Sequence, residues 1–509
     1  MKKDLERKKI KLNKNRIKNL SEEYEAVIFW VILSFFMVVF LDKMGTLFSG
    51  YHLVDDQNYI NINKGLMVNG LKEQLLRSVR GDFHLRFRPL WSFTRVLDTY
   101  FFMDSYGILS LKNVVVITTS SSLFFYYARR RGVSRAYASL LGFFTFLGNQ
   151  AAVLWRLGPQ EPVGLLLFSI ALVATDLLIK KKSFIRSSFF VLILILLTLQ
   201  KEAFLACMPG FYLLLFSSFL KERKEEKVSF FSLCGKFILK YKIEILLCIA
   251  VLAAEAYFIT TKVGLNSIEY AGFSVEDGLF YYLEGILRIM QGPFLPYLLF
   301  LFTFFLFFQQ IWKKEDFHVG NLIEILFPVY IILIQLVIHA KSGMWERYLI
   351  PAVIGVAYIA IILGHKYFHK NKRLYFVYLQ LLLIFLLNRG WNLPAQAKDF
   401  TLQAENFQEL VSDVLTNIST DDNILLCSDP ENQEIDYSFS LYLDYYHGYG
   451  NFSYLSEYEN EIEAIKEADL LFGLPGTVQT KIALEGVNKE DYRVHQTTHY
   501  EIAVKEGTN

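Results

Sequence analysis

Residues 106–135 read "YGILSLKNVVVITTSSSLFFYYARRRGVSR", and this stretch decides the class of the fold. The run from Tyr106 to Ala128 is mainly apolar and is long enough for a helix to cross the roughly 30 Å hydrocarbon core of a bilayer. A cluster of arginines follows at once, and such clusters mark the cytoplasmic ends of membrane helices. The stretch therefore predicts a membrane-spanning helix that ends on the cytoplasmic side.

The composition of the whole chain agrees with this interpretation. Of its 509 residues, 53% are hydrophobic and 16% are aromatic, and the mean hydropathy is +0.30. A soluble chain of this length would divide into domains that each need a polar surface, whereas here long apolar runs alternate with short basic clusters. We therefore expect a multi-pass protein of the cell membrane, with membrane lipids and no nucleic acid among its partners.

The apolar runs predict about 11 spans. They lie at about residues 24–41, 106–128, 136–154, 163–179, 187–199, 203–220, 243–261, 294–312, 321–338, 348–363 and 374–387. With the N-terminus inside, each predicted inner loop carries a basic cluster, such as "KKKSFIR" or "HKYFHKNKR". The odd count places the C-terminal region outside. The predicted parts are a basic cytoplasmic N-terminus (1–23), a mainly α transmembrane domain (24–390) with a long first outer loop (about 42–105), and a C-terminal domain (391–509).

The C-terminal region is predicted to be a small extracytoplasmic α/β domain. Residues 395–509 hold 22 acidic against 6 basic residues, yet the segment has the alternation of a folded domain. "DDNILLCSD" (421–429) predicts a buried strand, "EIEAIKEADLLFGLPG" (461–476) a helix and a strand, and "DYRVHQTTHYEIAVKE" (491–506) two late strands. His495 and His499 have the spacing of a metal-binding pair on a helix, but their context predicts strands.

The first outer loop is unusually rich in functional groups. "YHLVDDQNY" (51–59) places the carboxylates of Asp55 and Asp56 near the membrane surface, and "HLRFRPLWSFTR" (84–95) brings His84, Arg86 and Arg88. Outer loops normally avoid arginine clusters, and arginines at the interface can hold an anionic head group such as a lipid phosphate. Simple pairing with lipid heads or with nearby acids would also account for these arginines.

Three further polar segments are predicted on the same face. They are "RLGPQEP" with Gln160 and Glu161, "QKEA" with Lys201 and Glu202, and "KSGMWERYLIP" with Arg347 and Tyr348. Charged groups close to apolar helix ends are costly unless they are paired or hydrated. Each segment alone is compatible with side chains that reach toward the interface, but together they predict a polar cavity open to the outside.

These segments, in this order, resemble the GT-C class of membrane glycosyltransferases. "DDQNY" resembles the acidic signature "DE-x-x-Y" in the first outer loop of the protein O-mannosyltransferases and of the aminoarabinose transferases that modify lipid A. "GDFHLRFRPL" and "ERYLIP" are similar to an arginine-proline stretch and to a late arginine-tyrosine motif of these enzymes. The resemblance covers about residues 24–387. The Asp-Asp pair and the missing double proline depart from it, and the second departure leaves the acceptor class open.

The resemblance implies transfer of a hexose or pentose from a polyprenyl or dolichyl phosphate to a hydroxyl group of a glycan, lipid or protein, with inversion at the anomeric carbon. Asp55 would be the general base, and Asp56 would orient Asp55 or the acceptor. The groups implied for the donor phosphate are Arg347, Arg86, Arg88, Lys201 and Tyr348. The groups implied for substrate binding are Tyr59, His84, Glu161, Gln160 and Glu202.

Other functions remain open from the residues alone. A transporter for lipid-linked sugars would share the polar cavity, a polymerase or ligase would use a pyrophosphate-linked glycan, and a receptor would depend on the outer domain. The residues establish no cofactor, and the polyprenyl phosphate-linked sugar implied by the resemblance would be a donor substrate. A divalent metal at Asp55 and Asp56 is possible, although no third carboxylate lies near them in the sequence.

Overall fold

A computed structural model describes residues 2–53, 55–82, 86–102, 105–226, 228–263, 279–291, 319–341, 347–428, 432–458, 460–478 and 491–506. The helices of the membrane part are α1 (Lys2–Met44), α2 (Gln57–Asp82), α3 (Pro89–Phe102), α4 (Tyr106–Arg130), α5 (Arg135–Phe144), α6 (Glu161–Lys180), α7 (Phe184–Thr198), α8 (Glu202–Leu205), α9 (Met208–Glu222), α10 (Phe230–Lys240), α11 (Lys242–Phe258), α12 (Leu279–Gln291), α14 (Val319–Ile338), α15 (Ile350–Ala357), α16 (Gly364–Phe368) and α17 (Lys372–Gly390).

Long apolar helices confirm a multi-pass membrane protein. Among the described residues, eight helices or joined helices are long and apolar enough to cross a membrane, and α7 is a shorter apolar helix. Large apolar side chains on α1, α11 and α17 are exposed, among them Phe35, Leu246 and Ile384. Such surfaces suit contact with lipid tails rather than water. The predicted span at 294–312 lies outside the described residues.

The predicted third span, at 136–154, is wrong as a continuous helix. Helix α5 has only ten residues, about 15 Å at 1.5 Å per residue, and ends at Phe144. The chain then bends through Gly148, whose φ is 106°, into a 3₁₀ helix at Asn149–Leu154. The carbonyl of Leu147 accepts hydrogen bonds from Gln150 Nε2 (2.6 Å) and Arg389 Nε (2.9 Å). Irregular backbone is tolerated at membrane depth where protein groups satisfy it in this way.

The C-terminal part forms the α/β unit that the strand patterns predict. Its elements are α18 (Leu393–Asn417), β1 (Ile424–Leu426), α19 (Gln433–His447), β2 (Phe452–Tyr454), α20 (Glu461–Glu467), β3 (Leu470–Gly473), β4 (Tyr492–Gln496) and β5 (Glu501–Lys505). The sheet order is β2-β1-β3-β5-β4, with β1 parallel to β2 and β3, and β5 antiparallel to β3 and β4. Ile424 and Leu426 face one core and Leu425 the other, as a period of two requires.

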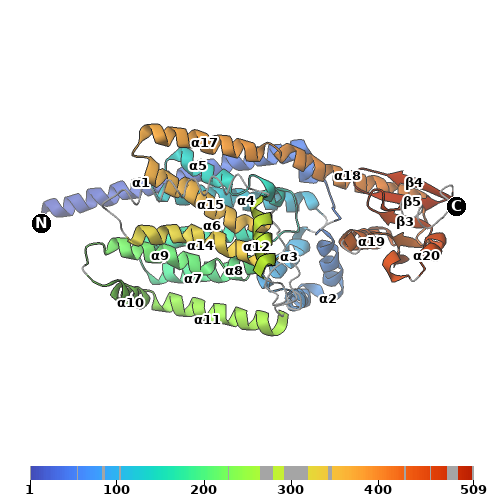
Figure 1. Ribbon diagram of the computed structural model, residues 1–509, viewed down its shortest axis with the longest axis horizontal. Coiled ribbons are helices and arrows are strands. Elements are labelled where there is room, and N and C mark those ends of the chain that lie inside the picture. The colour runs from blue at the N-terminus through green and yellow to red at the C-terminus, as the bar shows by residue number, and fades with distance from the viewer. Residues whose placement is uncertain are drawn as a thin grey trace.

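The N-terminus and the sheet lie at opposite ends of the helix bundle (Figure 1). Helices α2 and α3 cover the bundle end that faces the sheet. One apolar core joins this end to the C-terminal part, because Tyr51, Leu53 and Tyr59 pack with Phe407 of α18 and Phe439 of α19. The first loop is therefore held between the membrane helices and the sheet unit.

Candidate functional site

Asp55 lies where three polar segments of the sequence meet. Its Oδ2 accepts a hydrogen bond from Arg347 Nη2 at 3.2 Å, and the ion pair joins residues that are 292 positions apart. Gly158 packs directly on Asp55, since a Cβ on this glycine would lie 1.9 Å from the Cβ of Asp55. Only a residue without a side chain allows this approach. The first loop, the "RLGPQEP" segment and the "ERYLIP" segment thus share one site.

The backbone at Asp55 is in an uncommon conformation. Its φ of 74° is the one positive φ of a residue other than glycine in the described part of the chain. Asp and Asn tolerate this left-handed region better than other residues, and such positions concentrate at functional sites. The turn aims the side chain of Asp55 at Arg347, and α2 begins two residues later at Gln57.

Asp56 points into the protein instead. Its side chain is 2% exposed, and its Oδ2 accepts a hydrogen bond from the backbone N–H of His52 at 3.1 Å. Burial raises the pKa of Asp56 to about 8, against the lowering effect of that hydrogen bond and of Arg95. The carboxyl is therefore largely protonated at neutral pH. The two adjacent aspartates therefore differ in direction and in burial.

A buried ion pair lies beside Arg347. Lys201 Nζ is 2.5 Å from Glu161 Oε1, and both side chains are 3% exposed. The ammonium of Lys201 lies 4.3 Å from the ring centroid of Tyr348, and the guanidinium of Arg347 lies 5.5 Å from it. Two cations thus lie near one aromatic ring, and Glu161 compensates the charge of Lys201.

Two donors of Arg347 have no acceptor among the residues that the structure describes. Its Nε and Nη1 are buried and have no hydrogen-bond partner in the described part of the chain. The second oxygen of Glu161, Oε2, is in the same situation. Unsatisfied buried groups cost free energy, and in native proteins they often mark positions that a bound ion or ligand satisfies.

The arginine segment of the first loop is tied to the tip between α7 and α8. Glu202 Oε1 accepts a hydrogen bond from Phe87 N at 3.0 Å, and Leu90 N donates to Leu199 O at 3.0 Å. Arg88 stacks on Trp91 with its guanidinium carbon 4.3 Å from the ring centroid.

Arg86 contributes to the electrostatic environment of His339, a buried residue that the sequence analysis did not single out. Burial lowers the pKa of His339 to about 3, and the positive charges of Lys201 and Arg86 lower it further. His339 therefore stays neutral at physiological pH.

Other predicted residues take supporting positions. Tyr59 is buried beneath Arg95, whose guanidinium carbon is 4.2 Å from the ring centroid, and Arg95 Nη2 donates to the carbonyl of Gly158. The backbone carbonyl of Gln160 accepts a hydrogen bond from Gln200 Nε2 at 3.1 Å. His84 lies outside the described residues.

Gly158 and Arg95 hold the segment that contacts Asp55. In the sequence, Gly158 is indicated only by the Gly-Pro dipeptide of "RLGPQEP", and Arg95 only by the unusual number of arginines in the first outer loop.

No metal centre is evident at this site. Among the residues that the structure describes, no group of three or more His, Cys, Asp or Glu side chains is placed to hold a metal ion. The groups gathered here are instead one accessible carboxylate and several cations, with a buried acid between them. Such an arrangement can bind an anion beside a proton acceptor.

Comparison with known proteins identifies the fold. No protein-family model and no curated protein sequence matches the chain. Among solved structures, the chain is similar to ArnT from Cupriavidus metallidurans in a crystal structure bound to undecaprenyl phosphate. The TM-score is 0.50 and the sequence identity 11%, over 94% of this chain and 98% of ArnT. The chain therefore shares the fold of this ArnT structure, which is the fold expected from the GT-C resemblance of the sequence motifs.

Proposed function

We propose that this protein is an integral membrane glycosyltransferase that uses a polyprenyl phosphate-linked sugar as donor. One observation carries the proposal: the accessible carboxylate of Asp55 is paired with Arg347, and two more nitrogens of that guanidinium are buried without an acceptor among the described residues. A proton acceptor and an anion-binding group are therefore adjacent. The bound undecaprenyl phosphate in the similar ArnT structure supports a lipid phosphate as that anion.

In the proposed reaction, Asp55 takes the proton of an acceptor hydroxyl while the oxygen of that hydroxyl bonds to the anomeric carbon of the donor sugar. The bond from that carbon to the phosphate oxygen breaks on the opposite side, so the configuration inverts. The electron pair of the broken bond leaves on the lipid phosphate. Arg347 stabilises the growing charge through Nε and Nη1, and Lys201, which lies near the same Tyr348 ring, does so as well. The products are the glycosylated acceptor and the free lipid phosphate.

The remaining residues have supporting roles in this proposal. Glu161 fixes the ammonium of Lys201, and Glu202 fixes the arginine segment through Phe87. Asp56 holds the turn through the His52 N–H, so it positions Asp55 without contacting substrate. A neutral, buried carboxyl group is suited to a structural role of this kind.

The orientation belongs to the proposal as well. Helix α2, which begins two residues after Asp55, lies with α3 at the bundle end away from the N-terminus (Figure 1). The basic cluster after α4 lies at the other end of that helix from Tyr106, which packs against the first loop. By the positive-inside rule, the site and the sheet unit face the outside of the cell. The donor sugar would then meet a hydroxyl of a surface glycan, lipid or protein there.

The test compares the surface glycans of cells that lack the protein with those of cells carrying the wild type or a variant. Mass analysis should show one sugar residue missing without the protein and restored by the wild type and by Asp42→Asn. Asp42 is a matched control because it lies on the exposed side of the end of α1. Asp55→Asn should fail to restore the residue despite normal membrane insertion. Full restoration by Asp55→Asn would overturn the assignment.

A further inference from the structure

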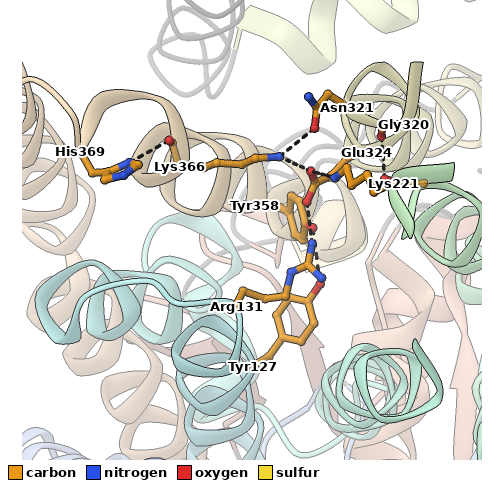
Figure 2. Close-up of polar contacts among 10 residues, drawn as sticks. Tyr127, Arg131, Lys221, Gly320, Asn321, Glu324, Tyr358, Lys366 and His369 are labelled. Carbon is orange, nitrogen blue, oxygen red and sulfur yellow. Dashed lines mark hydrogen bonds and ion pairs between the residues drawn. The ribbon is translucent and has the colours of Figure 1, made fainter. Parts of the chain in front are cut away.

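A second charged centre lies at the opposite end of the bundle, around Glu324 of α14. The carboxylate of Glu324 is 2% exposed and binds three cations (Figure 2). Arg131 Nη2 lies 2.7 Å from Oε1, while Lys221 Nζ and Lys366 Nζ lie 2.5 and 2.6 Å from Oε2. Lys366 also donates to Asn321 Oδ1 at 3.2 Å. One acid thus joins the ends of α4, α9 and α16.

A second acid beside it is also outnumbered. Asp176 of α6 pairs with Arg130 Nε at 2.6 Å and with Lys180 Nζ at 3.4 Å. The two carboxylates therefore face five Lys or Arg side chains. Basic clusters mark the cytoplasmic ends of membrane helices, and here they supply more cations than the two acids can pair. The surplus positive charge favours an anion.

A cavity adjoins these groups and offers room for that anion. Its volume is about 470 Å³, and its charged lining consists of Arg130, Arg131, Lys180 and Lys366 together with the acids Asp176 and Glu324. His365 and His369 line the same cavity, and Figure 2 places His369 on the same helix end as Lys366. Arginine forks and lysine ammonium groups are the side chains that bind phosphate oxygens best.

The cavity is separate from the Asp55 site. Helix α4 begins at Tyr106, which packs against Tyr51 and Tyr59 of the first loop, and it ends at Arg130. A helix of 25 residues is about 37 Å long, so the length of a bilayer lies between the two centres.

We propose that this cavity is a second phosphate-binding site, which holds a phosphate group at the membrane face opposite the Asp55 site. Its apolar lining by Val133, Ile179 and Ile362 suits the first carbons of a lipid chain, and its open cationic wall equally admits free phosphate. The shared ligand chemistry is a phosphate oxyanion. This inference does not rest on the proposed transferase function.

The experiment measures thermal unfolding of the full-length protein in two sets of conditions. One set is phosphatidylcholine nanodiscs with and without phosphatidic acid, and the other is plain nanodiscs titrated with inorganic phosphate. Lys180→Gln is the test variant, because Lys180 lines the cavity and is partly exposed. Lys181→Gln is its control, since Lys181 is an exposed neighbour outside the lining.

We expect phosphatidic acid or free phosphate to raise the unfolding temperature of the wild type. Lys180→Gln should weaken the apparent affinity about two- to fivefold, as expected for one partly exposed charge, and Lys181→Gln should not. A response to phosphatidic acid alone identifies a lipid head group, and an equal response to free phosphate identifies a soluble source. Equal behaviour of the two lysine variants, or no response in either set, would overturn the proposal.

Glu324→Gln gives an independent measurement. Removing this carboxylate leaves three cations without their acid, so added phosphate should stabilise the variant more than it stabilises the wild type. A network that serves only the fold would lose stability without gaining a response to phosphate. The Asp55 site is unchanged in all these variants, so any phosphate response from that site is the same in each. The comparison of the variants with the wild type therefore holds even if the transferase proposal fails.

Discussion

The two ends of the membrane bundle both place carboxylates against cations, but the two carboxylates differ in exposure and in the number of cations that they contact. At one end, Asp55 keeps partial exposure in a strained turn, and two donors of its partner Arg347 have no acceptor in the described part of the chain. At the other end, Glu324 is enclosed and accepts from three cations at once. A carboxylate that must accept a proton needs access and incomplete pairing, whereas one that fixes helices needs enclosure. Under the proposed function, the same chemical group would therefore serve two purposes, set by its surroundings.

Asp55→Asn tests the reactive end most directly. The change keeps the size of the side chain but removes its ability to take a proton at neutral pH. General base catalysis contributes about 10²–10⁴-fold, so transfer by the purified protein should fall within that range. Donor binding and thermal unfolding should change little. The comparison between the two ends fails if the variant transfers sugar at a near-normal rate.

Glu324→Gln should affect stability instead of transfer. Breaking a buried ion network by removing one partner typically costs about 3–5 kcal/mol, because the remaining charges stay buried without compensation. We therefore expect a clear loss in unfolding temperature, measured without added phosphate. The specific activity of the folded fraction should equal that of the wild type. A folded but inactive variant would show that both ends take part in catalysis.

Arg347→Ala separates donor binding from proton transfer. A hydrogen bond to a charged group contributes about 1.5–3 kcal/mol, so the affinity for polyprenyl phosphate should fall about tenfold or more. Arg347→Lys should recover part of the loss, because it restores the charge but not the fork of donors. Titration of both variants with undecaprenyl phosphate measures the effect. Unchanged affinity in Arg347→Ala would place the phosphate elsewhere.

Gly158→Ala tests the packing that aims Asp55. The added methyl group would overlap the Cβ of Asp55, so either the loop or the aspartate must move. Displacements of about 1 Å in a catalytic group cost up to about 10²-fold in rate, and we expect roughly tenfold here because the loop can yield. Gly235→Ala is the control, since no atom lies within 4 Å of the position where its Cβ would be. Equal transfer rates in the two variants would contradict the contact.

Asp56→Asn should have the smallest effect on turnover and a distinct effect on pH dependence. The folded state raises the pKa of Asp56 from 3.8 to about 8, so between these values the folded protein binds more protons than the unfolded chain. This residue therefore destabilises the fold progressively as pH rises toward 8. The amide of Asn keeps an acceptor for His52 N–H and does not ionise. Thermal unfolding from pH 5 to 8 should show a flatter profile for Asp56→Asn, and an identical profile would contradict the burial.

The sequence by itself determined the membrane class, the order of the polar segments and the strands of the C-terminal unit. Hydropathy runs, basic clusters and period-two alternation are local properties, and they are set by the solvent that each short segment must face. The resemblance of "DDQNY" to a family motif likewise needed no structure. The local patterns predicted the spans and strands, and the resemblance of the motifs predicted the GT-C fold.

The tertiary structure decided the rest. It broke the predicted third span at Phe144, because side chains from α17 and the 3₁₀ segment satisfy the exposed carbonyls. It turned the side chains of Asp55 and Asp56 toward different partners and packed Gly158 against Asp55. It also placed three cations around Glu324. Each of these outcomes depends on which groups from distant segments become neighbours. Burial and pairing are properties of the packed chain, so a pattern of adjacent residues cannot specify them.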